Sequence, residues 1–241
     1  MIHFHNLTLG YDRHPVIHHL HGEVAAGSLL AVIGPNGGGK STLLKGILGQ
    51  LAPLGGEIQL GVAREEIGYL PQQSRIDRQF PITVREVVAM GLWRHCGLFG
   101  RLAHSQRARV DAALERVGLE NMAESRLEAL SGGQLQRALF ARLWLQESRL
   151  MLLDEPFSAI DSQTTEDLLG LLHEWQQEGR TVLAVLHDMT QVSRHFPQSL
   201  LLAREVIAWG DTGEVLCESN LAKARRLPLA PDPQAVTCHR T

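Results

Sequence analysis

The segment GPNGGGKS at residues 34–41 decides how the rest of this chain is interpreted. It matches the phosphate-loop pattern G-x-x-x-x-G-K-[ST], with an apolar run before it and helical periodicity after it. The glycines let backbone N–H groups converge on phosphate oxygens, and the helix presents its positive end to the same anion. We expect Lys40 to reach the terminal phosphates and the Ser41 hydroxyl to ligate Mg²⁺. A glycine-rich turn with a chance Lys-Ser pair is the alternative, which the flanking patterns disfavour.

A second segment, LMLLDEP at residues 150–156, places two carboxylates directly after four apolar residues. In open α/β sheets, ligands bind beside the C-terminal ends of buried parallel strands. We therefore expect Asp154 to hold Mg²⁺ through water, and Glu155 to orient and deprotonate the attacking water. Two acids after a strand also suit a plain helix start, but the phosphate loop upstream favours the catalytic interpretation.

These two motifs also occur in kinases and GTPases, and the segment LSGGQ at residues 130–134 discriminates among such classes. Ser131 can cap the helix that follows, and Gly132 and Gly133 leave the backbone open to an anion. Because the phosphate loop already binds this chain's own nucleotide, we expect the second anion site to close on the nucleotide of another copy. Such a head-to-tail pair buries two ATP molecules at one symmetric interface. Taken alone, the segment is also compatible with an ordinary capped helix.

The rest of the chain alternates strand-sized apolar runs with segments of helical periodicity. This alternation predicts a mostly parallel sheet that is covered by helices on both faces. A helical pattern from residue 84 to about 126 lies between two strand regions and indicates an inserted helical lobe. Two further helices are expected at 135–145 and 166–177. No internal repeat or low-complexity block appears, so we expect a single unit.

Composition restricts the function classes. The net charge of −3 does not indicate nucleic acid or an anionic membrane surface as a partner. The three cysteines are far apart and fit a reducing cytoplasm better than a disulfide scaffold. No apolar run approaches the roughly 20 residues that a spanning helix needs, and residues 1–5 do not begin a signal peptide. If the protein serves a membrane, we expect it to dock onto another protein.

Together, the motifs resemble the ATPase domains of ABC transporters. The order and spacing match for the phosphate loop, Gln72, residues 131–134, Asp154 and Glu155, Asp161 and His187. The resemblance covers residues 1 to about 216. It implies an α/β phosphate-loop NTPase fold with a mostly parallel core sheet, an N-terminal antiparallel β subdomain and an α-helical subdomain inserted at about 84–147. Residues 1–227 then form the ABC ATPase domain, and the proline-rich segment 228–241 is expected to be a poorly ordered tail.

The resemblance also implies roles for individual residues. Tyr11 resembles the aromatic that stacks on adenine, Gln72 the glutamine that contacts Mg²⁺ and links the site to the helical lobe, and His187 the histidine that contacts the γ-phosphate. The segment SAID at residues 158–161, which ends at Asp161, resembles the loop that couples the two sites across a dimer. Taken singly, Tyr11 also suits a surface aromatic and His187 a strand-end histidine. The implied cofactors are ATP and Mg²⁺. The expected catalytic residues are Glu155, His187, Lys40 and Gln72, and the expected Mg²⁺ ligands are Ser41, Gln72 and Asp154. The expected nucleotide-binding residues are Tyr11, Gly34, Asn36, Gly37, Gly38, Gly39, Lys40, Ser41, Thr42, Asp154, Ser131, Gly132, Gly133, Gln134 and Asp161.

The segment FPITVREVVAMG at residues 80–91 resembles the zinc, manganese and iron importer branch, although the LWRH that follows departs from the usual basic–aromatic pair. The resemblance implies import of a divalent metal ion, zinc before manganese, powered from the cytoplasmic face of the plasma membrane by a peripheral subunit. The implied partners are a second copy, an integral membrane permease and a periplasmic or extracellular solute-binding protein, without nucleic acid. Iron–siderophore or cobalamin importers and soluble ABC ATPases with a non-membrane target are the alternatives. A small-molecule kinase is disfavoured because nothing resembles an acceptor site.

Twelve histidines invite a metal-binding interpretation. His3 and His5 share a strand face, and four more histidines lie between residues 14 and 21. We expect no functional metal site there, because metal ligands usually come with partners at defined spacing. The pair Cys238 and His239 is likewise expected to be incidental.

Overall fold

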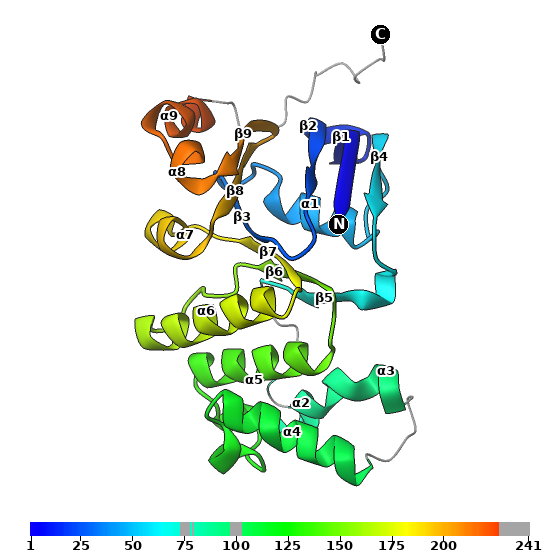
Figure 1. The fold of residues 1–241 in the computed structure, drawn as a ribbon, viewed down its shortest axis with the longest axis vertical. Coiled ribbons are helices and arrows are strands. Elements are labelled where there is room, and N and C mark those ends of the chain that lie inside the picture. Colours follow the sequence, from blue (N-terminus) through cyan, green and yellow to red (C-terminus); the bar gives the residue numbers. More distant parts are fainter. Residues whose placement is uncertain (73–77, 79, 97–102, 227–241) are drawn as a thin grey trace.

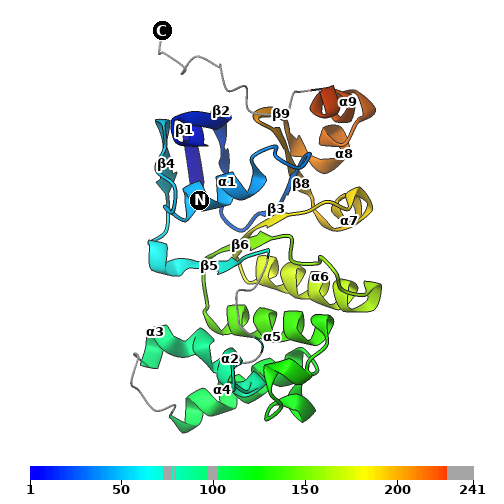
Figure 2. The same ribbon diagram turned by 180° about the vertical axis from the view of Figure 1, so that it is seen from behind.

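The computed structural model describes residues 1–72, 78, 80–96 and 103–226. Figure 1 shows the two sheets in the upper part of the molecule and helices α2 to α5 in a separate helical lobe below them. Seen from behind in Figure 2, α6 again lies between the larger sheet and this lobe. The expected tail at 228–241, with Cys238 and His239, falls outside the described residues.

The smaller sheet is antiparallel and has the strand order β2-β1-β4. Its strands are β1 (Ile2–Tyr11), β2 (His14–Val24) and β4 (Gly55–Leu60). The alternation at the start of β1 orients the sheet, because Ile2 and Phe4 are buried whereas His5 is exposed. The buried face packs against helix α1 (Lys40–Ile47), whose leucines belong to the same hydrophobic cluster.

The larger sheet has the strand order β5-β6-β7-β3-β8-β9, and all neighbouring pairs are parallel except β8 with β9. Its strands are β3 (Leu29–Ile33), β5 (Ile67–Leu70), β6 (Leu150–Asp154), β7 (Thr181–Val185), β8 (Gln198–Ala203) and β9 (Glu205–Asp211). Strands β3, β6 and β7 are buried along their whole length, which explains why their sequences are continuous apolar runs. The mostly parallel core sheet predicted from the sequence is confirmed.

The helices divide between the helical lobe and the larger sheet. The helical lobe contains α2 (Val84–Ala89), α3 (Trp93–Cys96), α4 (His104–Arg116) and α5 (Gly132–Leu145), with 3-10 turns η2 (Met90–Leu92), η3 (Glu120–Met122) and η4 (Leu127–Ala129). The remaining helical elements are η1 (Arg64–Glu66), α6 (Ser162–Gln177), α7 (Met189–His195), α8 (Thr212–Val215) and α9 (Glu218–Arg226). Of the helices in the described residues, none combines the length and the apolar character needed to cross a membrane.

Helices α5 and α6 both begin one turn earlier than their apolar periodicity predicts. The Ser131 hydroxyl accepts a hydrogen bond from the Gln134 N–H at 3.2 Å and so caps α5. The Asp161 carboxylate caps α6 by accepting from the Thr164 N–H at 2.8 Å. A cap satisfies the free N–H groups of a first turn that carries few apolar residues, so periodicity alone misses that turn.

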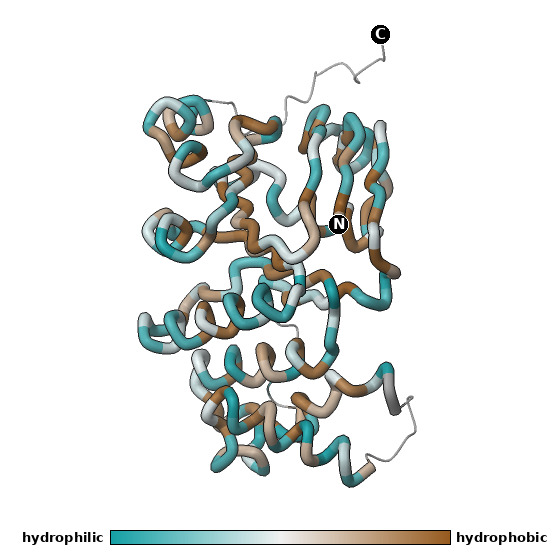
Figure 3. Tube along the Cα trace, viewed as in Figure 1, coloured by the Kyte–Doolittle hydropathy of each residue, from teal (hydrophilic) through white to brown (hydrophobic). Residues whose placement is uncertain are grey.

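Two hydrophobic clusters lie on opposite faces of the larger sheet. In β3, Leu30 and Val32 belong to the cluster beneath the smaller sheet, whereas Leu29, Ala31 and Ile33 face the helices. Figure 3 shows hydrophobic residues along the strands that separate these two layers. Between α5 and α6 the rings of Phe140 and Trp175 stack with centroids 5.6 Å apart. The helical lobe is thus joined to the larger sheet through α6.

We expect Gly91→Ala to destabilise the helical lobe. Gly91 lies in η2, where a Cβ atom would collide with the Arg142 carbonyl oxygen of α5. The free energy of unfolding should therefore fall by about 1–3 kcal/mol in urea titrations. The control is Gly170→Ala in α6, where nothing lies within 4 Å of the added Cβ and a gain of about 0.5–1 kcal/mol is expected. Equal stabilisation of both variants would contradict the close packing of η2 on α5.

Candidate functional site

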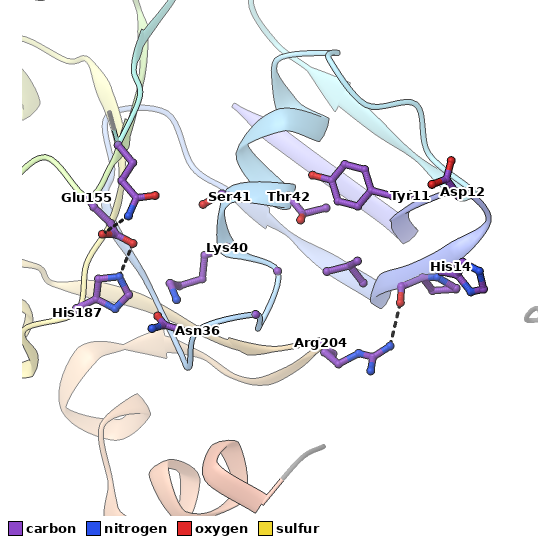
Figure 4. A pocket seen from close by; sticks show the side chains of 15 residues that line it. Tyr11, Asp12, His14, Asn36, Lys40, Ser41, Thr42, Glu155, His187 and Arg204 are labelled. Atoms are coloured by element: carbon purple, nitrogen blue, oxygen red, sulfur yellow. Dashed lines mark hydrogen bonds and ion pairs between the residues drawn. The ribbon is translucent and has the colours of Figure 1, made fainter. Parts of the chain in front are cut away.

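A cavity of about 870 Å³ lies where the larger sheet meets the β1–β2 hairpin, at the C-terminal ends of β3, β6 and β7. Figure 4 shows its side chains. The expected site residues that line it are Tyr11, Asn36, Gly37, Gly39, Lys40, Ser41, Thr42, Gln72, Glu155 and His187. Residues 131–134 and Asp161 lie outside its lining, and so do Gly34, Gly38 and Asp154. The structure thus brings the phosphate loop and the proposed catalytic side chains together.

The phosphate loop at residues 34–41 turns tightly between β3 and α1. Gly39 has a φ of 101°, a backbone conformation that side-chain-bearing residues rarely adopt. At Gly34 a Cβ atom would collide with the carbonyl oxygen of Leu202 at the end of β8. The glycines therefore permit a turn that lies directly against a neighbouring strand.

Lys40 reaches back over this loop. Its Nζ donates hydrogen bonds to the carbonyl oxygens of Gly34 at 2.9 Å and Pro35 at 3.0 Å. Burial lowers the pKa of Lys40, and the nearby carboxylates of Glu155 and Asp154 partly oppose that effect. The Lys40 ammonium is thus held at the loop by hydrogen bonds to two carbonyl oxygens. Phosphate oxygens of a bound nucleotide can replace these carbonyl oxygens as its partners.

Ser41 and Asp154 join the start of α1 to the end of β6. The Ser41 hydroxyl donates to the Asp154 Oδ1 at 3.2 Å. Asp154 is only 4% exposed, and burial raises the pKa of its carboxyl although the Ser41 hydrogen bond acts in the opposite direction. A hydroxyl beside a carboxylate offers the hard oxygen donors that Mg²⁺ prefers. The two residues therefore fit the metal ion that accompanies ATP in phosphate-loop enzymes.

We expect Asp154→Asn to stabilise the nucleotide-free protein at neutral pH. Because the pKa of Asp154 is raised in the folded state, its ionisation costs stability as the pH rises through that pKa. The gain in melting temperature, measured with EDTA, should therefore be present at pH 7 and vanish below about pH 4, near the pKa of an unperturbed aspartate. At Mg-ATP concentrations 100 times the wild-type Kd, the wild type should gain about 2.7 kcal/mol and the variant much less.

The control for this variant is Asp12→Asn. Asp12 is an exposed carboxylate at the other end of the same cavity, at a φ of 49° that asparagine also tolerates. The free energy of unfolding of Asp12→Asn should stay within about 0.5 kcal/mol of the wild-type value. A lower melting temperature for Asp154→Asn at pH 7 without Mg²⁺ would contradict the burial cost assigned to Asp154.

Glu155 is the centre of a hydrogen-bonded group. His187 Nε2 lies 2.5 Å from Glu155 Oε1, and Gln72 Nε2 donates to Glu155 Oε2 at 2.7 Å. The Ser158 hydroxyl donates to the same Oε2 at 3.3 Å. Burial raises the pKa of Glu155, but the contacts with His187, Ser158 and Gln72 outweigh it, so the net pKa lies below the usual value. Glu155 is therefore a carboxylate at neutral pH and can accept a proton.

The backbone of Glu155 is strained. Its φ of 51° is unusual for a residue with a side chain, and its N–H donates to the Val185 carbonyl of β7 at 3.1 Å. Strain of this kind is held in place by the surrounding structure and gathers at functional sites. Here it turns the chain sharply at the end of β6 and directs the carboxylate toward Gln72 and His187.

Residues 131–134 and Asp161 meet each other away from the cavity. Gln134 Oε1 accepts a hydrogen bond from the Ser131 N–H at 2.8 Å, which completes a capping box at the start of α5. A Cβ on Gly133 would lie 3.4 Å from the Asp161 carboxylate. The two loops thus form one surface outside the chain's own cavity.

Tyr11 stands at the opposite end of the cavity from Glu155 (Figure 4). It ends β1, is 42% exposed, and its hydroxyl accepts a hydrogen bond from Lys45 Nζ at 3.2 Å. The same ammonium lies 5.4 Å from the ring centroid. An exposed, fixed aromatic face of this kind can stack on a nucleobase.

Sequence reasoning missed several residues that line the cavity. Asp12, His14, Pro15 and Val16 surround the turn of the β1–β2 hairpin, and Arg204 follows β8. The residues of the hairpin turn could have been predicted as cavity residues, because they follow Tyr11 closely in the sequence. For Arg204 there was no such signal, because it stands alone between two short strands.

The outer face of the smaller sheet brings three histidines together. The ring centroids of His3 and His5 are 6.4 Å apart, and those of His5 and His21 are 6.0 Å apart. His3 also contacts Glu23 at 3.3 Å. Within residues 1–72, 78, 80–96 and 103–226, no group of three or more His, Cys, Asp or Glu residues is arranged to hold a metal ion.

The fold and the site define a class of protein. A phosphate loop after β3, a carboxylate pair after β6, and a glutamine and a histidine that converge on the second carboxylate are the parts of an ATP-hydrolysing phosphate-loop enzyme. Residues 17–158 match the family model described as ABC transporter. The chain belongs to the ABC transporter family and is an ABC ATPase, so the resemblance noted in the sequence is confirmed.

Relatives of known name support this placement. The chain is 40% identical to a probable metal transport system ATP-binding protein of Chlamydia pneumoniae, over 88% of this chain and 84% of that protein. It is 37% identical to the manganese transport system ATP-binding protein MntB of Halalkalibacterium halodurans, over 93% and 92%. It is also 37% identical to the zinc transport system ATP-binding protein TroB of Treponema pallidum, over 91% and 84%.

Solved structures agree with the fold. One is an ABC transporter described as of metal-chelate type, in an inward-facing conformation, at 32% identity and a TM-score of 0.83, covering 94% of this chain and 89% of that chain. Another is a dimeric post-hydrolysis state of the ATP-binding cassette MJ0796 bound to ADP and phosphate. Its identity is 27% and its TM-score 0.76, with coverage of 88% and 99%.

Proposed function

We propose that this chain is the ATP-hydrolysing subunit of an importer for a divalent metal ion, zinc or manganese, and that it works at the cytoplasmic face of the membrane. The observation that carries the proposal is the likeness to manganese and zinc transport ATP-binding proteins over 93% and 91% of the chain. Alignments of that extent include most of the helical lobe, the part that is expected to meet a permease. The alignments therefore support a proposal about the transported substrate as well as about ATP hydrolysis.

The surface of the helical lobe supports a permease as partner. Phe80 and Trp93 flank α2 and are 61% and 53% exposed. Aromatic side chains such as Phe and Trp are enriched at protein–protein interfaces. We propose that they face an integral membrane permease, which in turn receives the metal ion from an external solute-binding protein.

The cavity suits ATP in one orientation. The phosphates are proposed to bind the loop at 34–41 and the base to stack on Tyr11, at the two ends of the cavity. Ser41, Asp154 and the Gln72 amide oxygen would hold Mg²⁺, which supplies positive charge to the phosphate oxygens. Gln72 is placed for this role because its NH₂ group is already engaged with Glu155, which leaves the amide oxygen for the ion.

Hydrolysis is then assigned to Glu155 and its neighbours. Glu155 accepts a proton from the attacking water, and Gln72 and His187 hold its two oxygens in position. Lys40 and His187 meet the negative charge that spreads over the transferring phosphoryl group. Because Glu155 keeps a pKa below the usual value, it remains ionised and able to act as a base across the physiological pH range.

A second copy is proposed to complete each site. Residues 131–134 and Asp161 lie beside each other but outside the cavity of their own chain. In a head-to-tail pair, each α5 N-terminus would face the phosphates bound by the other copy. The likeness to the dimeric cassette MJ0796 supports this arrangement.

The test is whole-cell elemental analysis after deletion of the chain, with zinc, manganese or iron made limiting in turn. Rescue would use the wild type or Glu155→Gln, with Arg13→Ala as an exposed control outside the cavity lining. Loss of zinc or manganese alone, restored by the wild type and Arg13→Ala but not by Glu155→Gln, is the expected result.

Two other outcomes would contradict metal-ion import. Loss of iron only when it is offered as a chelate would move the substrate to a metal chelate, the alternative that the structural likeness to a metal-chelate type transporter favours. No change in any metal would leave the ATPase and its family in place but reject import of a metal ion.

A further inference from the structure

The turn between β8 and β9 contacts both the phosphate loop and strand β2, two parts of the chain that border the nucleotide cavity. Its only residue outside both strands, Arg204, donates its backbone N–H to the Gly38 carbonyl of the phosphate loop at 2.9 Å. The Arg204 carbonyl accepts the His18 N–H of β2 at 2.8 Å. Arg204 makes both contacts with a φ of 63°, a conformation that costs energy in a residue with a side chain. The strain is therefore held in place by contacts on two sides.

The side chain of Arg204 adds a third contact, at the base end of the cavity. Its Nη2 donates to the Pro15 carbonyl of β2 at 2.9 Å, as Figure 4 shows. Pro15 is paired with Gly10, and the next pair along the hairpin is Tyr11 with His14. The guanidinium thus contacts the strand that lies directly beside Tyr11, and it also lines the cavity.

Close packing leaves the turn little freedom to shift relative to the phosphate loop. A Cβ on Gly38 would lie 2.7 Å from the Leu202 carbonyl oxygen, just before the turn. On the other side of the loop, a Cβ on Gly39 would lie 2.7 Å from the Ile17 side chain of β2. The phosphate loop is thus packed between the end of β8 and the β1–β2 hairpin. A link from Arg204 to the hairpin therefore sets where the hairpin stands relative to the loop.

We propose that Arg204 is a positioning residue for the nucleoside part of ATP: it fixes the β1–β2 hairpin, and with it Tyr11, at the correct distance from the phosphate loop. The inference rests on the proposed stacking of the base on Tyr11. It assigns to Arg204 no contact with the reacting phosphates. The side-chain link to Pro15 should therefore matter for the affinity of the nucleoside end and leave the triphosphate end unchanged.

The experiment measures Kd for Mg-ATP and for Mg-tripolyphosphate, which lacks the nucleoside, by calorimetry. In Arg204→Ala the backbone contacts with Gly38 and His18 can persist, whereas the side-chain hydrogen bond to the Pro15 carbonyl is lost. We expect ATP to bind about tenfold more weakly, the loss of one hydrogen bond from a charged donor, with tripolyphosphate unchanged. The value of kcat at saturating ATP should change less than twofold. Arg204→Lys, which can still donate to a carbonyl, should recover most of the ATP affinity.

A control and a double variant separate this role from others. Arg13→Ala changes an exposed arginine at the tip of the same hairpin, also at positive φ and outside the cavity lining, and should leave both Kd values unchanged. If Arg204 acts through Tyr11, the variant with Tyr11→Ala and Arg204→Ala should bind ATP no more weakly than Tyr11→Ala alone. Additive losses would overturn the inference.

The remaining outcomes are also decisive. Equal weakening of tripolyphosphate and ATP in Arg204→Ala would show that the guanidinium acts on the phosphates, and would overturn the inference. Unchanged ATP affinity in Arg204→Ala, while Tyr11→Ala weakens ATP, would overturn it and leave the base contact of Tyr11 in place. Unchanged ATP affinity in Tyr11→Ala would instead reject the base contact on which the inference rests.

Discussion

Glu155→Gln is expected to lower kcat for ATP hydrolysis by about 10²–10⁴, the usual contribution of a positioned general base. Glutamine keeps the shape of the side chain but cannot accept a proton from water. It can still contact Gln72 and His187, which lie 2.7 Å and 2.5 Å from the carboxylate oxygens. Binding of Mg-ATP should therefore persist, because the phosphate loop and the Ser41–Asp154 pair are unchanged.

The measurement for Glu155→Gln is steady-state ATPase activity of the assembled transporter, together with nucleotide binding by the variant. Ser158→Ala is the matched control, because the Ser158 hydroxyl reaches the same carboxylate at 3.3 Å but cannot act as the base. We expect less than a tenfold loss there, the effect of one neutral hydrogen bond. An unchanged kcat in Glu155→Gln would show that another group, or water alone, takes the proton.

Ser131→Arg is expected to prevent the closed dimer while leaving ATP binding by the single chain intact. Ser131 stands at the N-terminus of α5, outside its own cavity, where the proposed partner nucleotide would approach. A long side chain at this point fills the space that the partner's phosphates need, and overpacking of this kind costs up to about 3 kcal/mol. The dimer Kd in Mg-ATP should rise on the order of 100-fold, because each 1.4 kcal/mol is a factor of ten.

Sedimentation of the Glu155→Gln chain with Mg-ATP, with and without Ser131→Arg, measures this effect without hydrolysis. Asn121→Arg provides a control, since it adds the same side chain at an exposed position of the helical lobe. It should dimerise like its parent. If Ser131→Arg also dimerises with the parent's affinity, then residues 131–134 do not close on the partner's nucleotide.

The sequence predicted the structure best where the residues of one short segment are enough to determine the conformation of that segment. Residues 150–154 are a buried strand because each of them is apolar except the last, and residues 34–41 can only turn as they do with glycine at Gly34 and Gly39. The start of α6 was less well predicted, because the cap at Asp161 acts without an apolar pattern, whereas the cap at Ser131 was expected from the sequence and is confirmed. Local chemistry thus fixes elements more reliably than their ends.

Contacts between distant segments were beyond such reasoning. Gln72 and His187 meet at Glu155 across sequence separations of 83 and 32 residues, and only the family resemblance indicated that they belong together. The contact between Arg204 and Pro15 spans 189 residues and had no motif to announce it. Strand β9 and helix α9 were likewise not anticipated, because neither carries a motif.

The hydrogen bond from Gln72 to Glu155 ties the hydrolysis site to the segment that leads into the helical lobe. If the permease moves that lobe, it alters the affinity for ATP, and thermodynamic linkage requires ATP to alter the permease equilibrium by the same factor. A coupling free energy of about 1–3 kcal/mol corresponds to a factor of roughly 5–150. In an importer built in this way, delivery of the cargo to the permease would change the affinity of the ATPase subunits for ATP. Without cargo, the two copies of the chain would stay apart and little ATP would be consumed.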